Sequence, residues 1–381
     1  MRNATHTLAT LLTLLFSIGC SNRSTVSTED FSVALYSPRH AGGFEIAGDE
    51  HGNSLIRVTK PWQGEGDMPE QTLMILCDGM QPPADYAGQT ITSAAERIVC
   101  MSSSHVAMLD ATDCTNTIVG VSGKQYISNP QVAANDSVAD IGYDPNLDFE
   151  RLVTLHPDIV LLYGVAGEST STTAKLRELK IPYLYIGDYA EQTPLGKAEW
   201  LVAVAEIAGR REQAVEVFDG IECRYEALRD SVAGIVSERP RIMLNTPYQD
   251  VWYMPSDDSY MVKLIEDAAG EYIYIGNNPN GGSKAIGLEQ AYMLVADADI
   301  WLNTGMYTSL DELRTLMPKF AGTRPMREGR IYNNNRRRTP SGGSDFWESA
   351  IVRPDIVLQD LVKIMHASGD DDNLYYYQRL K

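Results

Sequence analysis

The chain has no hydrophobic run long enough to span a membrane. The longest apolar stretch, Leu8 to Ile18, lies within the first twenty residues and covers eleven of them, short of the ~20 that a membrane-spanning helix needs. Positive charge is also scarce, with 32 Lys and Arg against 51 Asp and Glu and a net charge of −19. A nucleic-acid-binding protein needs a basic face, so we expect no nucleic-acid partner. The length of 381 residues is typical of two or three domains.

The familiar catalytic and metal-binding motifs are missing as well. There is no HExxH or GxSxG motif, the six histidines include no i, i+4 pair, and the five cysteines form no CxxC. The segment GVSGK at 120–124 ends like a phosphate-binding loop, but Ile118 replaces the required first glycine and Gln125 the Ser or Thr. We therefore predict that the protein is not an enzyme and has no cofactor and no metal site.

The first twenty residues have the features of an export signal. Arg2 precedes the apolar run, which ends at Gly19 and Cys20. The run SIGC resembles a bacterial lipobox, although Ser17 and Ile18 depart from the usual residues. The resemblance implies that Cys20 carries a lipid, and the polar residues 21–30 would then form a tether. The alternative is a soluble secreted protein in which Cys20 is incidental.

One short pattern occurs twice. DIVLLYG from Asp158 to Gly164 matches DIWLNTG from Asp299 to Gly305, and a Leu-rich helix that begins near Glu150 or Glu289 precedes each copy. The copies lie 141 residues apart (299 minus 158), too far for stacked solenoid repeats of about 20 to 50 residues. The repeat therefore predicts one equivalent element in each of two similar lobes.

Strand and helix patterns alternate from Arg97 onward, which predicts mostly parallel sheets covered by helices on both faces. Before Arg97, short apolar segments between Gly, Pro and Asp indicate strands joined by turns. A long apolar face from about 210 to 236 predicts a helix on the order of 40 Å that crosses between the lobes. We expect these parts: signal and lipobox 1–20, tether 21–30, β-rich extension 31–96, N-terminal lobe 97–193, connecting helices 194–238, C-terminal lobe 239–366 and a frayed tail 367–381. The C-terminal lobe should end with a helix from about Asp345 to His366, and the three tyrosines of the tail could instead pack on the surface.

Several motifs, in this order, resemble one protein family: RIVCMSSS, DPNLDFERLVTLHPDIVLLYG, IPYLYIGD, GLEQ before ADADIWLNTG, and SGGSDFWE before PDIVLQDL. Over residues 97 to 366 the chain is similar to the substrate-binding proteins of ABC importers for iron complexes and vitamin B12. The resemblance implies an α/β fold of two Rossmann-like lobes joined by one long rigid helix, with a shallow cleft and little closure. It also implies an iron chelate (siderophore or haem) or a corrinoid as ligand, an ABC permease with its ATPase as partner, and a periplasmic, lipid-anchored location.

In that family a glutamate on each lobe docks onto arginines of the permease. The matching positions are Glu150 in NLDFERL and Glu289 in GLEQA. The alternative is that each glutamate only stabilises its own helix, because a negative charge near the N-terminus interacts favourably with the helix dipole.

Ligands of such sheets bind beyond the carboxyl ends of the strands. Arg336, Arg337 and Arg338 form a basic cluster that is unusual in so acidic a chain and could clamp anionic groups; the alternative is a solvated loop. Tyr143 could be a turn residue, and Trp252 could belong to the core. The expected ligand-binding residues are Ser103, Ser104, Tyr126, Tyr143, Tyr163, Trp252, Asn303, Tyr307, Arg336, Arg337, Arg338, Phe346 and Trp347.

The arginine cluster favours an anionic iron chelate over cobalamin, so a corrinoid-binding protein of the same family remains the first alternative. Two further alternatives are an exported enzyme built on the same lobes and a surface lipoprotein that captures ligand without a permease.

Overall fold

The computed structural model of the chain describes residues 26–63, 68–77, 79–144, 146–165, 167–276, 282–367 and 373–381. The expected signal peptide, the lipidation at Cys20 and the first half of the tether lie outside these residues.

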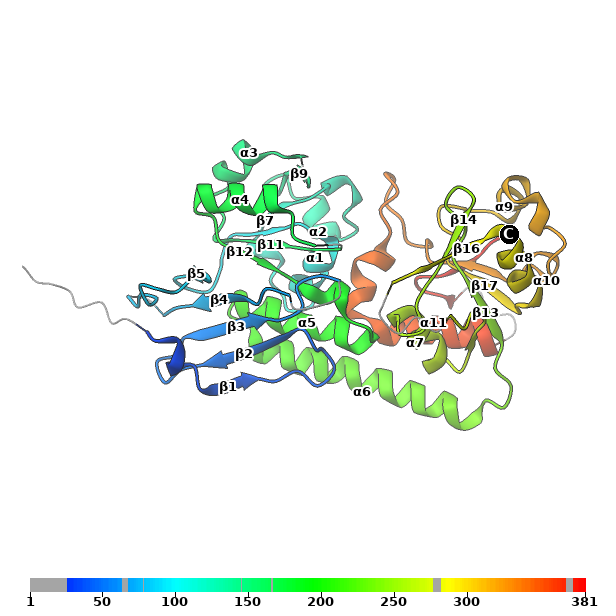
Figure 1. The fold of residues 1–381 in the computed structure, drawn as a ribbon, viewed down its shortest axis with the longest axis horizontal. Helices are drawn as coiled ribbons and strands as arrows, with labels where there is room; N and C mark the ends of the chain where they lie inside the picture. The colour runs from blue at the N-terminus through cyan, green and yellow to red at the C-terminus, as the bar shows by residue number, and fades with distance from the viewer. Residues whose placement is uncertain are drawn as a thin grey trace, which may run out of the picture.

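A five-stranded sheet precedes the first lobe (Figure 1). Its strands follow one another in chain order, and all neighbours are antiparallel except β4 and β5. The β-rich extension expected from the sequence is therefore present. Its strands are β1 (Val33–Tyr36), β2 (Phe44–Gly48), β3 (Ser54–Val58), β4 (Gln71–Ile75) and β5 (Gln89–Ile91).

The first lobe contains a parallel sheet of order β12-β11-β6-β7-β8. Its strands are β6 (Ile98–Cys100), β7 (Ile118–Val121), β8 (Ala139–Asp140), β11 (Ile159–Leu162) and β12 (Tyr183–Tyr185). Its helices are α1 (Ser103–Asp110), α2 (Pro130–Ala133), α3 (Phe149–Thr154) and α4 (Thr170–Leu179), and a small hairpin joins β9 (Gly142–Tyr143) to β10 (Asn146–Leu147).

The second lobe has the order β15-β13-β17-β18-β19, parallel except for its last strand. Its strands are β13 (Arg241–Leu244), β15 (Glu271–Tyr272), β17 (Ile300–Leu302), β18 (Ile331–Asn333) and β19 (Gln378–Arg379). Its helices are α7 (Tyr260–Asp267), α8 (Leu288–Asp297), α9 (Leu310–Leu316), α10 (Arg324–Glu328) and α11 (Pro354–His366). The segment VWYM forms β14 (Val251–Met254), which pairs with β16 (Lys284–Gly287) outside the main sheet.

The repeated sequence occupies the same place in both lobes. In each lobe the repeated strand, β11 or β17, follows a short helix and lies between the first strand of its sheet, β6 or β13, and the next sheet strand along the chain, β12 or β18. The repeated aspartates also make the same contact: Asp158 accepts from the backbone N–H of Arg97 at 2.9 Å, and Asp299 from that of Arg241 at 2.7 Å. Each carboxylate ties the start of the repeated strand to that of the first strand of its sheet, which confirms the interpretation as one element in two similar lobes.

Two helices join the lobes. All residues of α5 (Pro194–Ile207) are buried, because the helix packs against the extension, α1, α6 and α7. Helix α6 (Arg211–Ile235) runs beneath both lobes in Figure 1 and packs against α5 and α11. Its 25 residues correspond to roughly 38 Å at 1.5 Å per residue. Within the described ranges, no helix is both long and apolar enough to cross a membrane.

Two expectations for the end of the chain are wrong. The helix expected from Asp345 to His366 begins only at Pro354, since the preceding residues form two short 3₁₀ turns. Proline lacks an N–H and fits the first turn of a helix, so it marks the start. The tail is not frayed in its described part, because β19 pairs with β18 and the rings of Tyr376 and Tyr377 are buried.

Candidate ligand-binding groove

A groove of about 830 Å³ lies between the lobes. The first lobe contributes the segment after β7, including Lys124, and the second lobe contributes Arg336, Arg337 and Arg338 from the loop after β18. The groove lining includes these four cations and two acids, Asp140 and Asp345. The excess of two positive charges (four minus two) contrasts with the net charge of −19 for the whole chain. The groove can therefore attract an anionic ligand.

The two acids of the lining are already engaged within the protein. Asp140 accepts from the backbone N–H groups of Gly123 and Lys124, each at 3.1 Å. Asp345 accepts from Nε of Arg337 at 2.5 Å, and that pair holds the pKa of Arg337 above its usual value. The neighbouring Arg336 and Arg338 are exposed on the groove surface.

The loop that carries the arginines touches the first lobe directly. Thr339 donates its hydroxyl to the carbonyl of Gln125 at 3.2 Å. A Cβ on Gly343 would lie 2.1 Å from the carbonyl oxygen of Tyr126, so only glycine fits this approach. The hydroxyl of Ser103 donates to the carbonyl of Trp347 at 3.2 Å. These contacts join the two lobes, and Thr339 and Gln125 also line the groove.

Glu348 bridges the lobes through two hydrogen bonds. Its two carboxylate oxygens accept from the backbone N–H groups of Ser128 at 2.7 Å and Asn129 at 2.6 Å. Burial raises the pKa of Glu348 from its usual 4.5 to about 7, the two N–H groups oppose this rise, and Asp345 and Asp110 add to it. The carboxyl therefore changes its charge near neutral pH.

The pH dependence of stability tests this bridge. The pKa of Glu348 in the folded protein exceeds that of the unfolded chain, so its contribution to stability is present at low pH and lost as the pH rises through about 7. The free energies of unfolding of the wild type and of Glu348→Gln are measured with urea at each pH. Their difference, wild type minus variant, should fall by about 2.5 kcal/mol between pH 5 and pH 8. A difference that stays constant over this range would contradict the burial of an ionisable Glu348.

Three of the expected ligand residues, Arg336, Arg337 and Arg338, line the groove. Four others, Tyr126, Tyr143, Tyr163 and Trp347, are exposed. The rings of Tyr126 and Tyr143 are 6.3 Å apart, and a Cβ on Gly123 would lie 2.5 Å from the hydroxyl of Tyr143. Tyr163 follows β11, and Trp347 is 53% exposed beside the arginine loop. Asn303 has a left-handed backbone (φ 59°) directly after β17. Tyr307 is half-buried against the core.

Three expected ligand residues lie in the interior instead. Trp252 is fully buried and donates its indole N–H to the carbonyl of Leu244 at 2.9 Å. Ser104 is buried, and its hydroxyl pairs with that of Ser102 at 2.9 Å. Phe346 is buried against the rings of Tyr376 and Tyr377. The expectation that these three side chains face the ligand is wrong. Their position in an apolar strand or near a strand end does not show whether a side chain points into the core.

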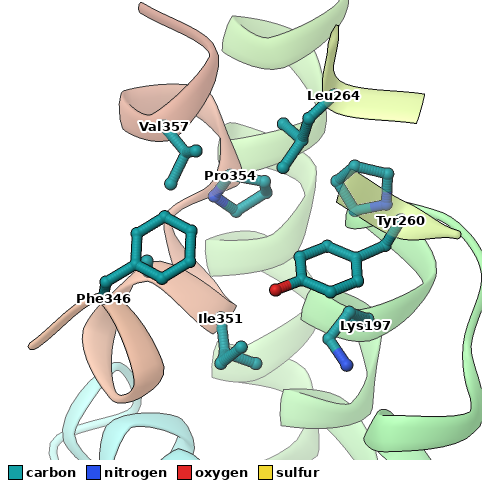
Figure 2. A pocket seen from close by; sticks show the side chains of 9 residues that line it. Lys197, Tyr260, Leu264, Phe346, Ile351, Pro354 and Val357 are labelled. Carbon is teal, nitrogen blue, oxygen red and sulfur yellow. The ribbon is translucent and has the colours of Figure 1, made fainter. Parts of the chain in front are cut away.

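Figure 2 shows a second, much smaller cavity of about 20 Å³ where the lobes meet. Phe346 and Tyr260 face each other across it, among apolar side chains from α7 and α11. Lys197 of α5 lies at its edge and donates to the carbonyl of Asp188 at 2.7 Å, while its ammonium lies 4.9 Å from the centre of the Tyr260 ring. The volume is about that of one water molecule, so the cavity marks a packed lobe junction and is not a site for a chelate.

Glu150 and Glu289 are both exposed, each in the first turn of the helix before the repeated strand. In Figure 1, α3 lies at the top of the first lobe, opposite α6, and α8 lies in the outer part of the second lobe. Their equivalent positions in two similar lobes leave both carboxylates accessible to a partner.

Sequence reasoning missed Glu348, Asp345 and Asp140. Lys124 belongs to the loop from Lys124 to Tyr126, which its position after a strand predicts to be a ligand loop. Glu348 had no local signal, since its partners are about 220 positions earlier in the chain. Among the described residues, no three His, Cys, Asp or Glu side chains are grouped to hold a metal ion.

Two similar α/β lobes with a groove between them define a two-lobed solute-binding protein. The sequence model of the periplasmic binding protein family matches residues 98–335, more than half of the chain. The chain belongs to this family, which confirms the resemblance seen in the sequence. An uncharacterized lipoprotein of Methanocaldococcus jannaschii, MJ0878, is 24% identical over 286 residues, which are 71% of this chain and 65% of that protein.

Solved structures confirm the fold. A periplasmic haem-binding protein of Pseudomonas aeruginosa has a TM-score of 0.55 and 17% identity, covering 72% of this chain and 94% of its own. The vitamin B12-binding protein BtuF of Vibrio cholerae has a TM-score of 0.53 and 15% identity, covering 71% of this chain and 96% of its own. The siderophore-binding protein FhuD of Vibrio cholerae, bound to Fe³⁺-Desferal, also has a TM-score of 0.53 and 15% identity, covering 71% of this chain and 99% of its own. The extension before residue 98 lies outside the family match.

Proposed function

We propose that this protein is the substrate-binding lipoprotein of an ABC importer, which captures an anionic iron chelate, a siderophore or haem, between its lobes and delivers it to a membrane permease. The observation that carries the proposal is the interlobe groove with its four cations in a strongly acidic chain. The exposed tyrosines at the strand ends, Tyr126, Tyr143 and Tyr163, add aromatic surface for a bulky ligand.

The location follows from the same proposal. A lipid on Cys20 would hold the protein outside the cytoplasmic membrane, with residues 21–30 as the tether. The description of MJ0878 as a lipoprotein supports this part. Glu150 and Glu289 would dock onto arginines of the permease.

A titration tests the ligand. The purified protein is titrated with haemin, a ferric tricatecholate siderophore and cyanocobalamin, and tryptophan fluorescence is recorded, because Trp347 is 53% exposed beside the groove. We expect one of the two anionic chelates to bind and to be recovered intact by mass spectrometry. Binding of cyanocobalamin alone would replace the chelate with a corrinoid, and breakdown of the bound chelate would indicate an enzyme. If none of the three binds, the proposal fails.

Arg338→Ala tests the role of the cations. Arg338 is exposed in the groove lining, and a charge-assisted contact to an anionic group contributes about 1.5 kcal/mol. We expect the affinity for the anionic chelate to fall about tenfold and to depend less on salt, with no change in melting temperature. Arg210→Ala, which removes an exposed arginine at the start of α6, is the matched control. Equal affinities of the two variants would exclude Arg338 from the site.

A further inference from the structure

The last nine residues, 373–381, form a structured segment on the second lobe, which we call the C-terminal segment. Its strand β19 extends the sheet by pairing with β18, and β18 leads three residues later to Arg336. The segment lies outside the family match of residues 98–335. The common core of the family therefore does not account for it.

A buried carboxylate helps to hold this segment in place. Asp360 of α11 accepts from three successive backbone N–H groups, those of Tyr375 at 2.8 Å, Tyr376 at 2.7 Å and Tyr377 at 3.1 Å. Burial raises the pKa of Asp360, and the three N–H groups oppose that rise. Three donors on one acceptor fix the backbone path, so the directions of the three tyrosine side chains are set as well.

The segment contacts expected ligand residues at three points. The guanidinium of Arg337 lies 4.5 Å from the centre of the Tyr375 ring. The backbone N–H of Arg336 donates to the carbonyl of Tyr376 at 3.2 Å. The hydroxyl of Tyr377 donates to Oδ1 of Asn303 at 3.0 Å. The segment thus touches three of the residues expected to bind ligand.

We propose that the C-terminal segment positions the ligand-binding side chains: Tyr375 orients the guanidinium of Arg337, and Tyr377 orients the amide of Asn303. Arg337 is held between the face of Tyr375 and the carboxylate of Asp345, which restricts a long side chain with many rotamers before any ligand arrives. A side chain ordered in the free protein loses less entropy on binding, so the affinity increases. This inference rests on the proposed capture of an anionic ligand in the groove.

The test compares Tyr375→Leu with Tyr375→Phe. Tyr375 is 44% exposed, so neither change opens a cavity in the core. Leucine removes the aromatic face while phenylalanine keeps it, and we expect Tyr375→Leu to bind the anionic chelate about fivefold more weakly, with Tyr375→Phe binding as the wild type does. Tyr253→Leu, at an equally exposed tyrosine (45%) of β14, is the control. Melting temperatures should be equal in all four proteins.

A second measurement needs no ligand. The Nε–H of Arg337, which donates to Asp345, should give a separate signal in ¹H–¹⁵N spectra of the free protein, assigned by its loss in Arg337→Lys. We expect the signal to persist in Tyr375→Phe and to broaden or shift in Tyr375→Leu.

The two measurements separate the possible failures. An unchanged affinity in Tyr375→Leu overturns the inference, and so does a lower affinity with an unchanged Arg337 signal, because Tyr375 would then act by touching the ligand itself. If the wild-type protein binds no chelate, the proposed function fails. In that case the NMR signal still tests the positioning of Arg337, which fails if the signal is the same in Tyr375→Leu as in the wild type.

Discussion

Replacement of Glu199 by alanine is expected to lower the free energy of unfolding by about 4 kcal/mol. This carboxylate in the buried helix α5 accepts from the hydroxyl of Tyr36 at 2.7 Å and from the backbone N–H groups of Arg39 at 2.8 Å, His40 at 2.8 Å and Ala41 at 2.7 Å. Glu199→Ala leaves these donors without their acceptor inside the protein. Each unsatisfied buried donor costs roughly 1 to 3 kcal/mol, and local rearrangement with water offsets part of the sum.

The same variant should loosen the β-rich extension. The segment from Tyr36 to Ala41 joins β1 to β2 and is held on α5 by Glu199, so limited proteolysis should cut it faster in Glu199→Ala. Glu216→Ala, at an exposed position of the adjacent helix α6, is the matched control and should change neither quantity. Urea unfolding measures the first effect. A loss below about 1 kcal/mol would mean that the extension is anchored by other contacts.

Reversal of both proposed docking charges, Glu150→Lys with Glu289→Lys, is expected to reduce uptake to the level of cells that lack the protein while ligand affinity stays unchanged. Each exposed ion pair with the permease contributes only about 0.2 to 1 kcal/mol. Two reversals replace attraction with repulsion at both ends of the complex, and charge repulsion across an interface costs several kcal/mol. Both glutamates are exposed and neither lines the groove, so the ligand contacts remain intact.

 Uptake of labelled chelate by cells that carry the matching permease measures the effect.

The control for this experiment keeps the same change in net charge. Glu212→Lys with Glu216→Lys places two lysines on exposed positions of α6, on the side of the molecule opposite α3 in Figure 1. This variant should support normal uptake. Loss of uptake in both double variants would point to a general charge effect, and normal uptake in both would exclude docking through Glu150 and Glu289.

The repeated pattern around Asp158 and Asp299 made the two-lobed fold predictable, because similar local sequences form the same helix and the same strand in both lobes. The arginine cluster was predictable for a similar reason, since three consecutive cations stand out in an acidic chain and follow a strand. Local patterns of this kind depend only on neighbouring residues, and the alternation of strands and helices depends on the same information.

Other features depended on partners far away in the chain. Trp252 and Phe346 looked like candidates for the site, yet packing turned both into the interior. The tyrosines near the C-terminus looked like part of a loose tail, but Asp360, fifteen to seventeen positions earlier, captures their backbone. The carboxylates of Glu199 and Glu348 gave no signal because their donors lie about 160 and 220 positions away.

The sequence by itself determined the family, the two equivalent lobes and the charge of the loop that enters the groove, since periodicity, repetition and composition are written along the chain. The tertiary structure alone decided which side chains face the groove, how the lobes are bridged and which side chains contact Arg337. A buried carboxylate can be satisfied by N–H groups from any part of the chain, so only the folded arrangement reveals which donors it meets.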